Sequence, residues 1–518
     1  MLTKAPTPKC RRLFFFRIER RRKVQLIETI NTAVNNFVWG LPMLVLLVGT
    51  GILMTVLTRF FQVSHIRHWF KHTLGGIFKN KHVTAHTPGH DKQISQFQSL
   101  CTALAATIGT GNIAGVAAAL AMGGPGAIFW MWIVAFFGMM TNYSENVLGI
   151  FYRRKNSEGE WCGGAMYYLK DGLGSKKGCK QIGAVLAVLF SIFCVLASFG
   201  IGNMSQINSI AVNLNSVFKI PYIATGLILM VLAGLVIVGG LKRIASVTEK
   251  LVPFMAVLYV IGCFVIVIAN IGLVGEALTA IFKGAFALKA AGGGIVGHGV
   301  KIAVTWGMKR GVFSNEAGLG SSVMVHSASN VKEPVRQGMW GIFEVFADTI
   351  VVCTLTALAV LTSGVMDLET GLMISTNEKT ALVAEAFEGT LGAAGGWFIA
   401  IAITLFAFST VLGWSVYGSK AFEYLFGTRA MIAYKIVFVL FVVIGATMDL
   451  SLAWDLSDTF NGLMAMPNLI GVIVLSGTVM NITKNYVDRH IRGKNEMPML
   501  SAIPEIQKEQ EERTDDEE

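Results

Sequence analysis

Residues Gly109-Thr110-Gly111-Asn112 interrupt an apolar segment of about residues 97–122 that is long enough to cross a membrane. Each glycine costs a helix roughly 1 kcal/mol relative to alanine. In hydrocarbon the freed backbone groups need partners, so a break survives only beside protein or a watery cavity. Such a break offers amides to an anion and carbonyls to a cation. The alternative is close packing of membrane helices through small residues.

A second interrupted segment, KRGVFSNEAGLGSS at 309–322, follows later in the chain. A shift of 209 positions carries Gly109–Asn112 onto Gly318–Ser321, and a shift of 216 carries Gly202 onto Gly418. Two glycine-interrupted apolar segments at corresponding positions are typical of secondary transporters with a binding site near the midplane. An enzyme is disfavoured, because the spans contain neither HExxH nor GxSxG. Two inverted broken helices around a closed site also argue for alternating access rather than for a channel.

The composition predicts an all-α polytopic membrane protein. Of 518 residues, 53% are hydrophobic and 14% are charged, which is more apolar than a soluble domain. The net charge of +11 comes from short basic segments between apolar runs, so it indicates membrane orientation rather than nucleic-acid binding. The seven cysteines include no CxxC pair, so the sequence indicates neither a metal site nor a disulfide framework. No cofactor is expected.

These interrupted segments must be positioned by about eleven membrane helices. A basic extension (1–36) precedes a first helix at 37–58. Ten core helices follow, five in a first repeat (93–275) and five in a second (295–483), and the odd number per repeat inverts one repeat relative to the other. The core helices are expected at about 97–122, 125–151, 181–213, 221–239, 247–273, 296–326, 337–363, 395–425, 430–448 and 452–481.

Lys and Arg gather in alternate loops, which places those loops and the C-terminus in the cytoplasm. An odd number of helices then puts the N-terminus outside, although its basic residues would favour the cytoplasmic side. The sequence does not resolve this conflict between charge and helix number. The charged tail spans 484–518, and its acidic end, QKEQEERTDDEE (507–518), is expected to be disordered.

Three strings resemble the alanine or glycine:cation symporters of bacteria and archaea: ATIGTGNIAGVA (106–117), KRGVFSNEAGLGSS (309–322) and GWSVYGSKAFEYLFG (413–427). The resemblance covers about residues 30–490. It implies the LeuT-like fold, a 5+5 inverted repeat in which the first helix of each repeat is broken. It also implies import of small neutral amino acids (alanine, glycine) with sodium, across the inner membrane of a bacterium. Coupling to protons, or transport of serine or glutamine, remains the alternative.

The resemblance implies a substrate site at the two breaks. The carboxylate would lie near the amides of Thr110, Gly111 and Asn112, and the ammonium near the carbonyls of Phe313 and Ser314. Glu316 is expected to hold the ammonium or the unwound backbone, unless it pairs with Lys309 or Arg310.

Sodium prefers oxygen ligands. By analogy with the fold, one sodium site would use the carbonyl of Thr107 and the side chains of Asn112 and Ser314. A second would use the carbonyls of Ala105 and Ile108 with the hydroxyls of Ser409 and Thr410. The alternative is that these hydroxyls bond only to their own helix.

Other polar and aromatic residues have more open roles. Gln206 is expected to orient the substrate, or, with Asn203, to join helices. Trp414, one turn from Thr410, is expected to limit the side-chain pocket to the size of Gly, Ala or Ser, unless it is a packing residue. Lys309 and Arg310 are expected in an outer vestibule. Glu145 and Asp348 are either gating or structural residues. Asp449, Asp455 and Asp458 are expected to be outer-gate or interface residues.

Overall fold

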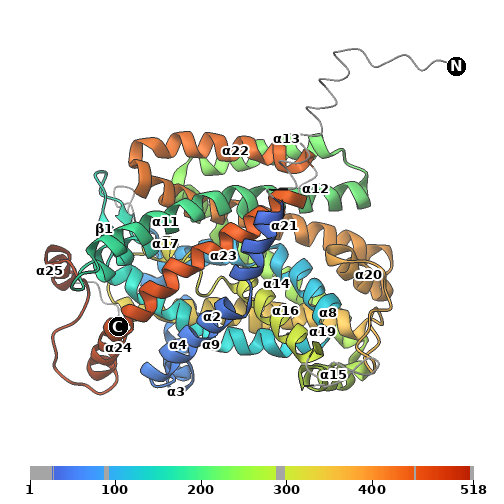
Figure 1. The fold of residues 1–518 in the computed structure, drawn as a ribbon, viewed down its shortest axis with the longest axis horizontal. Coiled ribbons are helices and arrows are strands. Elements are labelled where there is room, and N and C mark those ends of the chain that lie inside the picture. Colours follow the sequence, from blue (N-terminus) through green and yellow to red (C-terminus); the bar gives the residue numbers. More distant parts are fainter. Residues whose placement is uncertain (1–25, 27, 87–92, 287–297, 449–450, 514–518) are drawn as a thin grey trace, which may run out of the picture.

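The computed structural model describes residues 26, 28–86, 93–286, 298–448 and 451–513, and these are mostly helical. The exception to the helical pattern is a short antiparallel pair, β1 (Arg154–Lys155) and β2 (Trp161–Cys162), in the loop after the long helix α9 (Gly126–Phe151). Figure 1 shows the helices stacked as a bundle, with α13 (Tyr222–Ile237) and α22 (Met431–Thr447) together along one edge.

Membrane-spanning helices account for most of the described chain. Seven are long and apolar enough to cross a membrane, and the number rises to nine if each of two bent pairs counts as one span. The expected number of eleven is not confirmed on length and composition. The first span starts earlier than expected, at Glu28, and runs to Leu57. The expected extension lies mostly in residues 1–25, outside the described residues.

The first half contains the expected core helices with additional π-helical turns. Its elements are α2 (Leu41–Leu57), α7 (Gln96–Thr107), η1 (Gly111–Gly115), α8 (Val116–Gly123), α9, α11 (Lys180–Phe199), η3 (Gly200–Met204), α12 (Ser205–Phe218), α13 and α14 (Gly240–Ala269). Short elements occupy its loops: α3 (Phe61–Ser64), α4 (Ile66–His72), α5 (Leu74–Lys79), α6 (Lys81–Thr84), α10 (Ala165–Tyr167), η2 (Tyr168–Leu173), η4 (Ile271–Leu273) and α15 (Val274–Phe286).

The second half follows the same plan. Its elements are α16 (His298–Asn315), α17 (Val323–His326), α18 (Pro334–Val345), η5 (Phe346–Cys353), α19 (Thr354–Thr362), α20 (Lys379–Leu391), α21 (Ala393–Phe426), η6 (Thr428–Ala430), α22, α23 (Ser451–Val474), α24 (Ser476–His490) and α25 (Pro504–Glu512). Helices α15 and α20 were not expected, because both lie in loops between the expected spans.

Glycines let the central helices α9 and α16 approach closely. A Cβ added at Gly307 would lie 2.3 Å from the carbonyl oxygen of Ala127, and one at Gly311 would lie 2.5 Å from Cγ1 of Val134. Packing through small residues is the usual way for membrane helices to associate. It brings the second broken helix directly against α9.

Both expected breaks are present. The first bends the chain by 50° between α7 and the residues that follow Gly111. Helix α7 begins at a capping box, in which Ser95 and Gln98 satisfy each other's backbone amides. The second break separates α16 from α17, and its backbone is left-handed at Glu316 (φ 55°), Gly318 (φ 92°) and Gly320 (φ 71°). Glycine adopts this conformation freely, so the sequence itself ends the helix.

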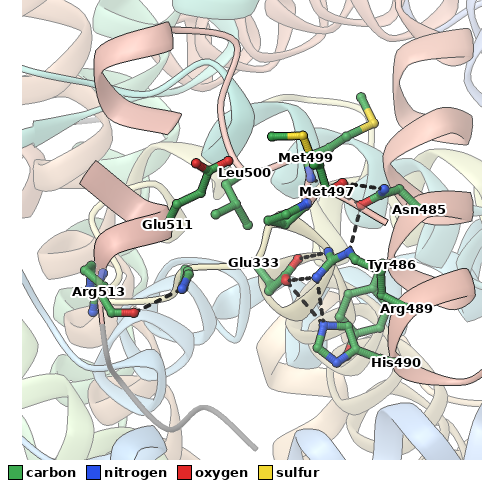
Figure 2. A network of polar contacts seen from close by, with 12 residues as sticks. Glu333, Asn485, Tyr486, Arg489, His490, Met497, Met499, Leu500, Glu511 and Arg513 are labelled. Atoms are coloured by element: carbon green, nitrogen blue, oxygen red, sulfur yellow. Dashed lines mark hydrogen bonds and ion pairs between the residues drawn. The ribbon is translucent and has the colours of Figure 1, made fainter. Parts of the chain in front are cut away.

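The expectation of disorder at the acidic end of the tail is wrong for residues 507–513, and residues 514–518 lie outside the described residues. Figure 2 shows Arg489 holding both carboxylate oxygens of Glu333, at 2.7 and 2.8 Å, with His490 at 3.2 Å. The acidic helix α25 lies against basic loops, with Lys155 Nζ 2.6 Å from Oε1 of Glu509. The tail is ordered because its charges find partners on the loops of the helical bundle.

Candidate functional site

The two breaks face each other in the interior of the bundle. A Cβ added at Gly111 would lie 3.4 Å from both Cδ1 of Phe313 and Cα of Ser314. Between the breaks lies a cavity of about 20 Å³. It is lined by Ala106, Thr107, Gly109, Thr110, Gly111, Ile201, Gln206, Phe313, Glu316, Thr410, Trp414 and Asn461. Most of the residues expected to bind substrate are therefore gathered around one small space.

The first break presents unbonded amides to this cavity. Within the described residues, no backbone carbonyl accepts a hydrogen bond from the amide of Thr110 or Gly111. The third expected donor differs, because the amide of Asn112 bonds to the carbonyl of Gly109 at 3.3 Å. The side chain of Asn112 in turn accepts from the amide of Gly109 at 3.0 Å. Two amides beside a half-helix N-terminus suit a carboxylate.

The second break presents carbonyls and the carboxylate of Glu316. No backbone amide of the described residues donates to the carbonyls of Phe313 or Ser314. Glu316 accepts from Nε1 of Trp414 at 3.0 Å and from Oγ of Ser321 at 2.5 Å. Its side chain therefore fixes both the unwound backbone and the indole.

The alternative in which Glu316 pairs with Lys309 or Arg310 is not what the structure shows. Lys309 lies 3.0 Å from Oδ2 of Asp458. Arg310 lies over the ring of Phe313, 5.5 Å from its centroid. Lys309 and Arg310 are part of α16 and precede the break, whereas Glu316 lies beyond the end of this helix.

Asp348 forms the centre of a buried polar cluster beside both breaks. Its carboxylate accepts from Nδ2 of Asn112 at 2.7 Å and from Oγ of Ser314 at 2.8 Å. Thr349 donates to it from the same turn, at 2.8 Å. The side chain is completely buried, so a negative charge here requires a cation or a proton. The sequence contained a signal for this residue, a single acidic side chain within the apolar run FADTIVVC.

The hydroxyls of Ser409 and Thr410 approach the first break from α21. They lie 3.3 and 3.1 Å from the carbonyl oxygen of Ala105 and also bond to the carbonyl of Phe406 on their own helix. The hydroxyls therefore do not bond only to their own helix, because they also reach a carbonyl that was expected to bind sodium. Thr107 and Ile108, whose carbonyls were expected to bind sodium, are buried at the end of α7.

Gln206 and Trp414 border the same cavity from α12 and α21. The hydroxyl of Thr110 donates to Oε1 of Gln206 at 3.0 Å, so Gln206 contacts the first break. Its expected neighbour Asn203 instead donates to the carbonyl of Phe438, at 2.7 Å, and joins two helices. Trp414 packs on Gly202, where an added Cβ would lie 2.5 Å from the indole.

Asn461 on α23 is a lining residue that was not anticipated from the sequence. It is 2% exposed, and its Oδ1 has no hydrogen-bond partner in the described part of the chain. A buried amide oxygen without a donor is costly, so this atom is available to a donor on a bound solute. Only its position in the cavity wall identifies Asn461 as a candidate binding residue, because an asparagine in an apolar helix is otherwise read as a packing residue.

A larger vestibule of about 530 Å³ adjoins the small cavity and shares Thr110 and Phe313 with it. Arg310 and Asp455, which were expected in an outer vestibule and its gate, both line this cavity. Lys309 and Asp458 instead form the ion pair described above. Asp449 lies outside the described residues.

Glu145 supports the second break from α9. Asn468 donates to its carboxylate and also to the carbonyl of Gly318, the latter at 2.9 Å. Tyr168 donates to Asn468 in turn. This arrangement favours the structural role for Glu145.

Comparison with known proteins agrees with this geometry. Residues 24–499 match the sodium:alanine symporter family. The chain is 47% identical over 463 residues to the sodium/alanine symporter AgcS of Methanococcus maripaludis, covering 89% of this chain and 98% of that protein. It is 35% identical to the probable sodium/glutamine symporter GlnT of Bacillus subtilis, covering 91% and 93%.

Among solved structures, MhsT in complex with L-phenylalanine matches with a TM-score of 0.51 at 14% identity, covering 76% of this chain and 99% of that one. This likeness shows the LeuT-like fold. The sequence matches show a transporter rather than an enzyme. The chain therefore belongs to the sodium:alanine symporter family, and it is a multi-pass membrane protein that carries amino acids by symport.

Proposed function

We propose that this protein imports small neutral amino acids, alanine or glycine, together with sodium by alternating access. The observation that carries the proposal is the cavity between the two facing breaks. We further propose that its core comprises inverted repeats at 93–275 and 295–483. The membrane is the bacterial inner membrane, and the C-terminus lies in the cytoplasm, on the same face as the basic loops.

In the proposed complex, the two poles of the amino acid contact opposite breaks. The carboxylate accepts from the free amides of Thr110 and Gly111, and the ammonium donates to the carbonyls of Phe313 and Ser314. Ile201 and Trp414 border the space left for the side chain. A cavity of this size holds about one water molecule, so the breaks must part to bind any amino acid, and a small side chain requires the least separation.

The proposed sodium sites flank the first break. Asp348 joins Asn112, Ser314 and the carbonyl of Thr107 in one site, where its carboxylate supplies a negative charge beside neutral oxygens. The second site uses the carbonyls of Ala105 and Ile108 with Ser409 and Thr410. Because both sites share the unwound segment with the substrate, binding of sodium organises the amides that receive the carboxylate.

Access from outside is proposed to pass through the vestibule. Phe313 separates the vestibule from the cavity, and Arg310 lies over its ring. Toward the other face the first half-helix packs tightly on α21, since a Cβ at Gly413 would lie 2.7 Å from the backbone nitrogen of Ala106. Transport therefore requires α7 and α21 to separate.

Uptake of labelled alanine into proteoliposomes tests the proposal. Sodium, lithium and a pH gradient alone are compared as driving conditions, and serine and glutamine compete with alanine. Sodium-driven uptake with transient accumulation in counterflow supports the carrier. Uptake that ignores sodium, or a preference for glutamine, contradicts the proposed coupling ion or substrate.

Two glycine substitutions on the same broken helix provide a matched pair. A Cβ at Gly109 would lie 2.4 Å from Oγ1 of Thr410, whereas one at Gly115 has open space. We expect Gly109→Ala to abolish sodium-driven uptake and Gly115→Ala to retain it. Equal uptake by the two variants would show that transport does not require the close contact between Gly109 and Thr410.

A further inference from the structure

A completely buried polar cluster lies beyond the second break, toward the basic loops, and plays no part in the proposed binding sites. His326 on α17 and Glu344 on α18 are both 0% exposed, and Nε2 of His326 lies 3.0 Å from Oε2 of Glu344. Asn142 on α9 donates to the same carboxylate oxygen at 3.2 Å. The cluster therefore joins three elements of the core.

The hydrogen bonds of this cluster indicate the tautomer of His326 that accompanies the present orientation of the Gln337 amide. Nδ1 receives a hydrogen bond from Nε2 of Gln337 at 2.5 Å, with Oγ of Ser99 at 3.3 Å. Since Nδ1 accepts, the ring hydrogen resides on Nε2 and is donated to Glu344. This tautomer directs the ring N–H at Oε2 of Glu344.

The same arrangement leaves three buried oxygens without a donor in the described part of the chain. They are Oε1 of Gln337, Oε1 of Glu344 and Oδ1 of Asn146. Buried polar atoms are normally satisfied, so unsatisfied ones call for an explanation. One of them, Oε1 of Gln337, would gain a donor from one added proton and one amide rotation, as follows.

We propose that His326 and Glu344 form a proton-binding site that makes sodium binding sensitive to cytoplasmic pH. A proton from cytoplasmic water adds to Nδ1 of His326. The amide of Gln337 turns over, so that its Oε1 accepts from the new N–H. The turned amide gives up the contacts of its Nε2 with Nδ1 of His326 and Oγ of Ser99, and the imidazolium and Glu344 then form an ion pair. A proton on Oε1 of Glu344 is the equivalent neutral state.

The charges around the pair determine the direction of the effect. Glu344 lies within electrostatic reach of Glu145, Glu316 and Asp348. Arg153 is the nearby cation and donates to the carbonyls of Ser327, Ser329 and Val331 just after His326. A proton at the pair reduces the net negative charge near Asp348. It therefore weakens sodium binding there, and sodium in turn opposes protonation.

The other elements packed on α17 and α18 add few titratable groups. Between Gln96 and Thr107, α7 contributes no charged side chain. The titratable groups include Tyr143 on α9, Tyr417 on α21, and, at the start of α18, Arg336 with His72 on α4 and Tyr486 on α24. Glu333, which precedes α18, is paired with Arg489 and His490 on α24. None of these would replace His326 as a neutral base in contact with Glu344.

The position of the pair connects it to both broken helices. His326 belongs to the half-helix that follows the second break, and Ser99 belongs to the half-helix that precedes the first. Both half-helices lead toward the basic loops. Protonation at their junction therefore acts on the elements that must part for release into the cytoplasm. This inference rests on the proposed sodium symport.

The test is the sodium dependence of alanine uptake in proteoliposomes at several internal pH values. For the wild type, we expect the half-saturating sodium concentration to rise by about fivefold or more as internal pH falls. In His326→Gln this dependence should disappear, because glutamine can bridge the same neighbours and binds no proton. His86→Gln is the control, since His86 is 63% exposed and contacts Glu249 outside the cluster. It should follow the wild type.

A binding measurement covers the case in which His326→Gln does not transport. Sodium-dependent thermal stabilisation of purified protein in detergent is compared at low and high pH for wild type, His326→Gln and Glu344→Gln. A pH-dependent sodium effect in the wild type that is lost in both variants supports the site. An unchanged pH dependence in His326→Gln would overturn it. Absence of sodium-driven alanine uptake by the wild type at every pH would instead overturn the proposed function.

Discussion

The indole N–H of Trp414 donates a hydrogen bond to Oε1 of Glu316 over 3.0 Å. The bond joins α21 to the second break and sets the plane of the ring beside the cavity. Trp414 borders the cavity, where it was expected to limit the side-chain pocket. Its hydrogen bond to Glu316 was not expected. Glu316 orients the aromatic wall while its other oxygen holds Ser321.

Substitution of Trp414 separates the wall from the hydrogen bond. Trp414→Phe keeps an aromatic ring but leaves Oε1 of Glu316 without its donor. An unsatisfied buried acceptor costs about 1–3 kcal/mol, so we expect kcat/KM for alanine to fall by at least about fivefold. Trp414→Ala should also admit larger amino acids, as measured by competition with leucine.

Trp397→Phe is the matched control, because Trp397 lies on the same helix and is 54% exposed. It should transport like the wild type. Unchanged selectivity in Trp414→Ala would remove Trp414 from the pocket.

Asp348 offers a direct test of the first sodium site. Asp348→Asn keeps the shape but removes the charge, and one amide hydrogen would face the donors Asn112 and Ser314. We expect the half-saturating sodium concentration to rise by about tenfold or more, which corresponds to roughly 1.4 kcal/mol of lost sodium binding. Sodium titration of alanine uptake measures it. Glu369→Gln, at an exposed carboxylate, should leave it unchanged, and a wild-type titration for Asp348→Asn would exclude this ligand.

Asn461 is expected to discriminate among small substrates. Its unpaired oxygen lies in the cavity wall, where a donor on the solute would satisfy it. Asn461→Leu has a similar size and no acceptor, so uptake of serine should decrease about tenfold more than uptake of alanine. Competition between the two amino acids measures the ratio. A parallel decrease for both would indicate packing alone, and Asn377→Leu, at an exposed position, controls for a general effect.

The contacts of Glu333 with Arg489 and His490 in the tail, called the tail clamp below, predict that the free energy of unfolding depends on pH. Burial opposes ionisation of Glu333, but hydrogen bonds from His490 and Arg489 outweigh it, so the pKa of Glu333 lies below its ordinary value. A lowered folded-state pKa stabilises the fold above the unfolded pKa, and this contribution is lost as pH falls through the folded pKa. Glu333→Gln should therefore cost roughly 2 kcal/mol near neutral pH.

Thermal unfolding and limited proteolysis of the tail measure that loss. The difference between wild type and Glu333→Gln should shrink as the pH falls below the ordinary range of a glutamate carboxyl, because the wild-type side chain takes up a proton only there. Glu505→Gln, at an exposed position in α25, should behave like the wild type at every pH. A tail that is equally protected in Glu333→Gln would show that the tail clamp does not hold it.

Local features of the sequence were sufficient for the breaks and for most of the spans. Glycine within an apolar run weakens a helix wherever it occurs, so Gly109, Gly111, Gly318 and Gly320 indicate their conformation without help from the fold. Apolar length likewise predicts a span from composition alone. Composition did not predict the helix ends within the membrane or the number of spans, because bent helices and polar half-helices interrupt the apolar runs.

Tertiary structure alone decided which side chains meet. Asn112 contacts Asp348 across 236 positions of sequence, and Trp414 contacts Glu316 across 98. Such pairs depend on how the helices cross, which no local pattern encodes. The tail shows the same limit, since its charges look solvated in the sequence until Glu333 and Lys155 are placed beside them. The sequence by itself therefore determined where the two helices are broken. The packing of distant helices determined which side chains lie beside those breaks.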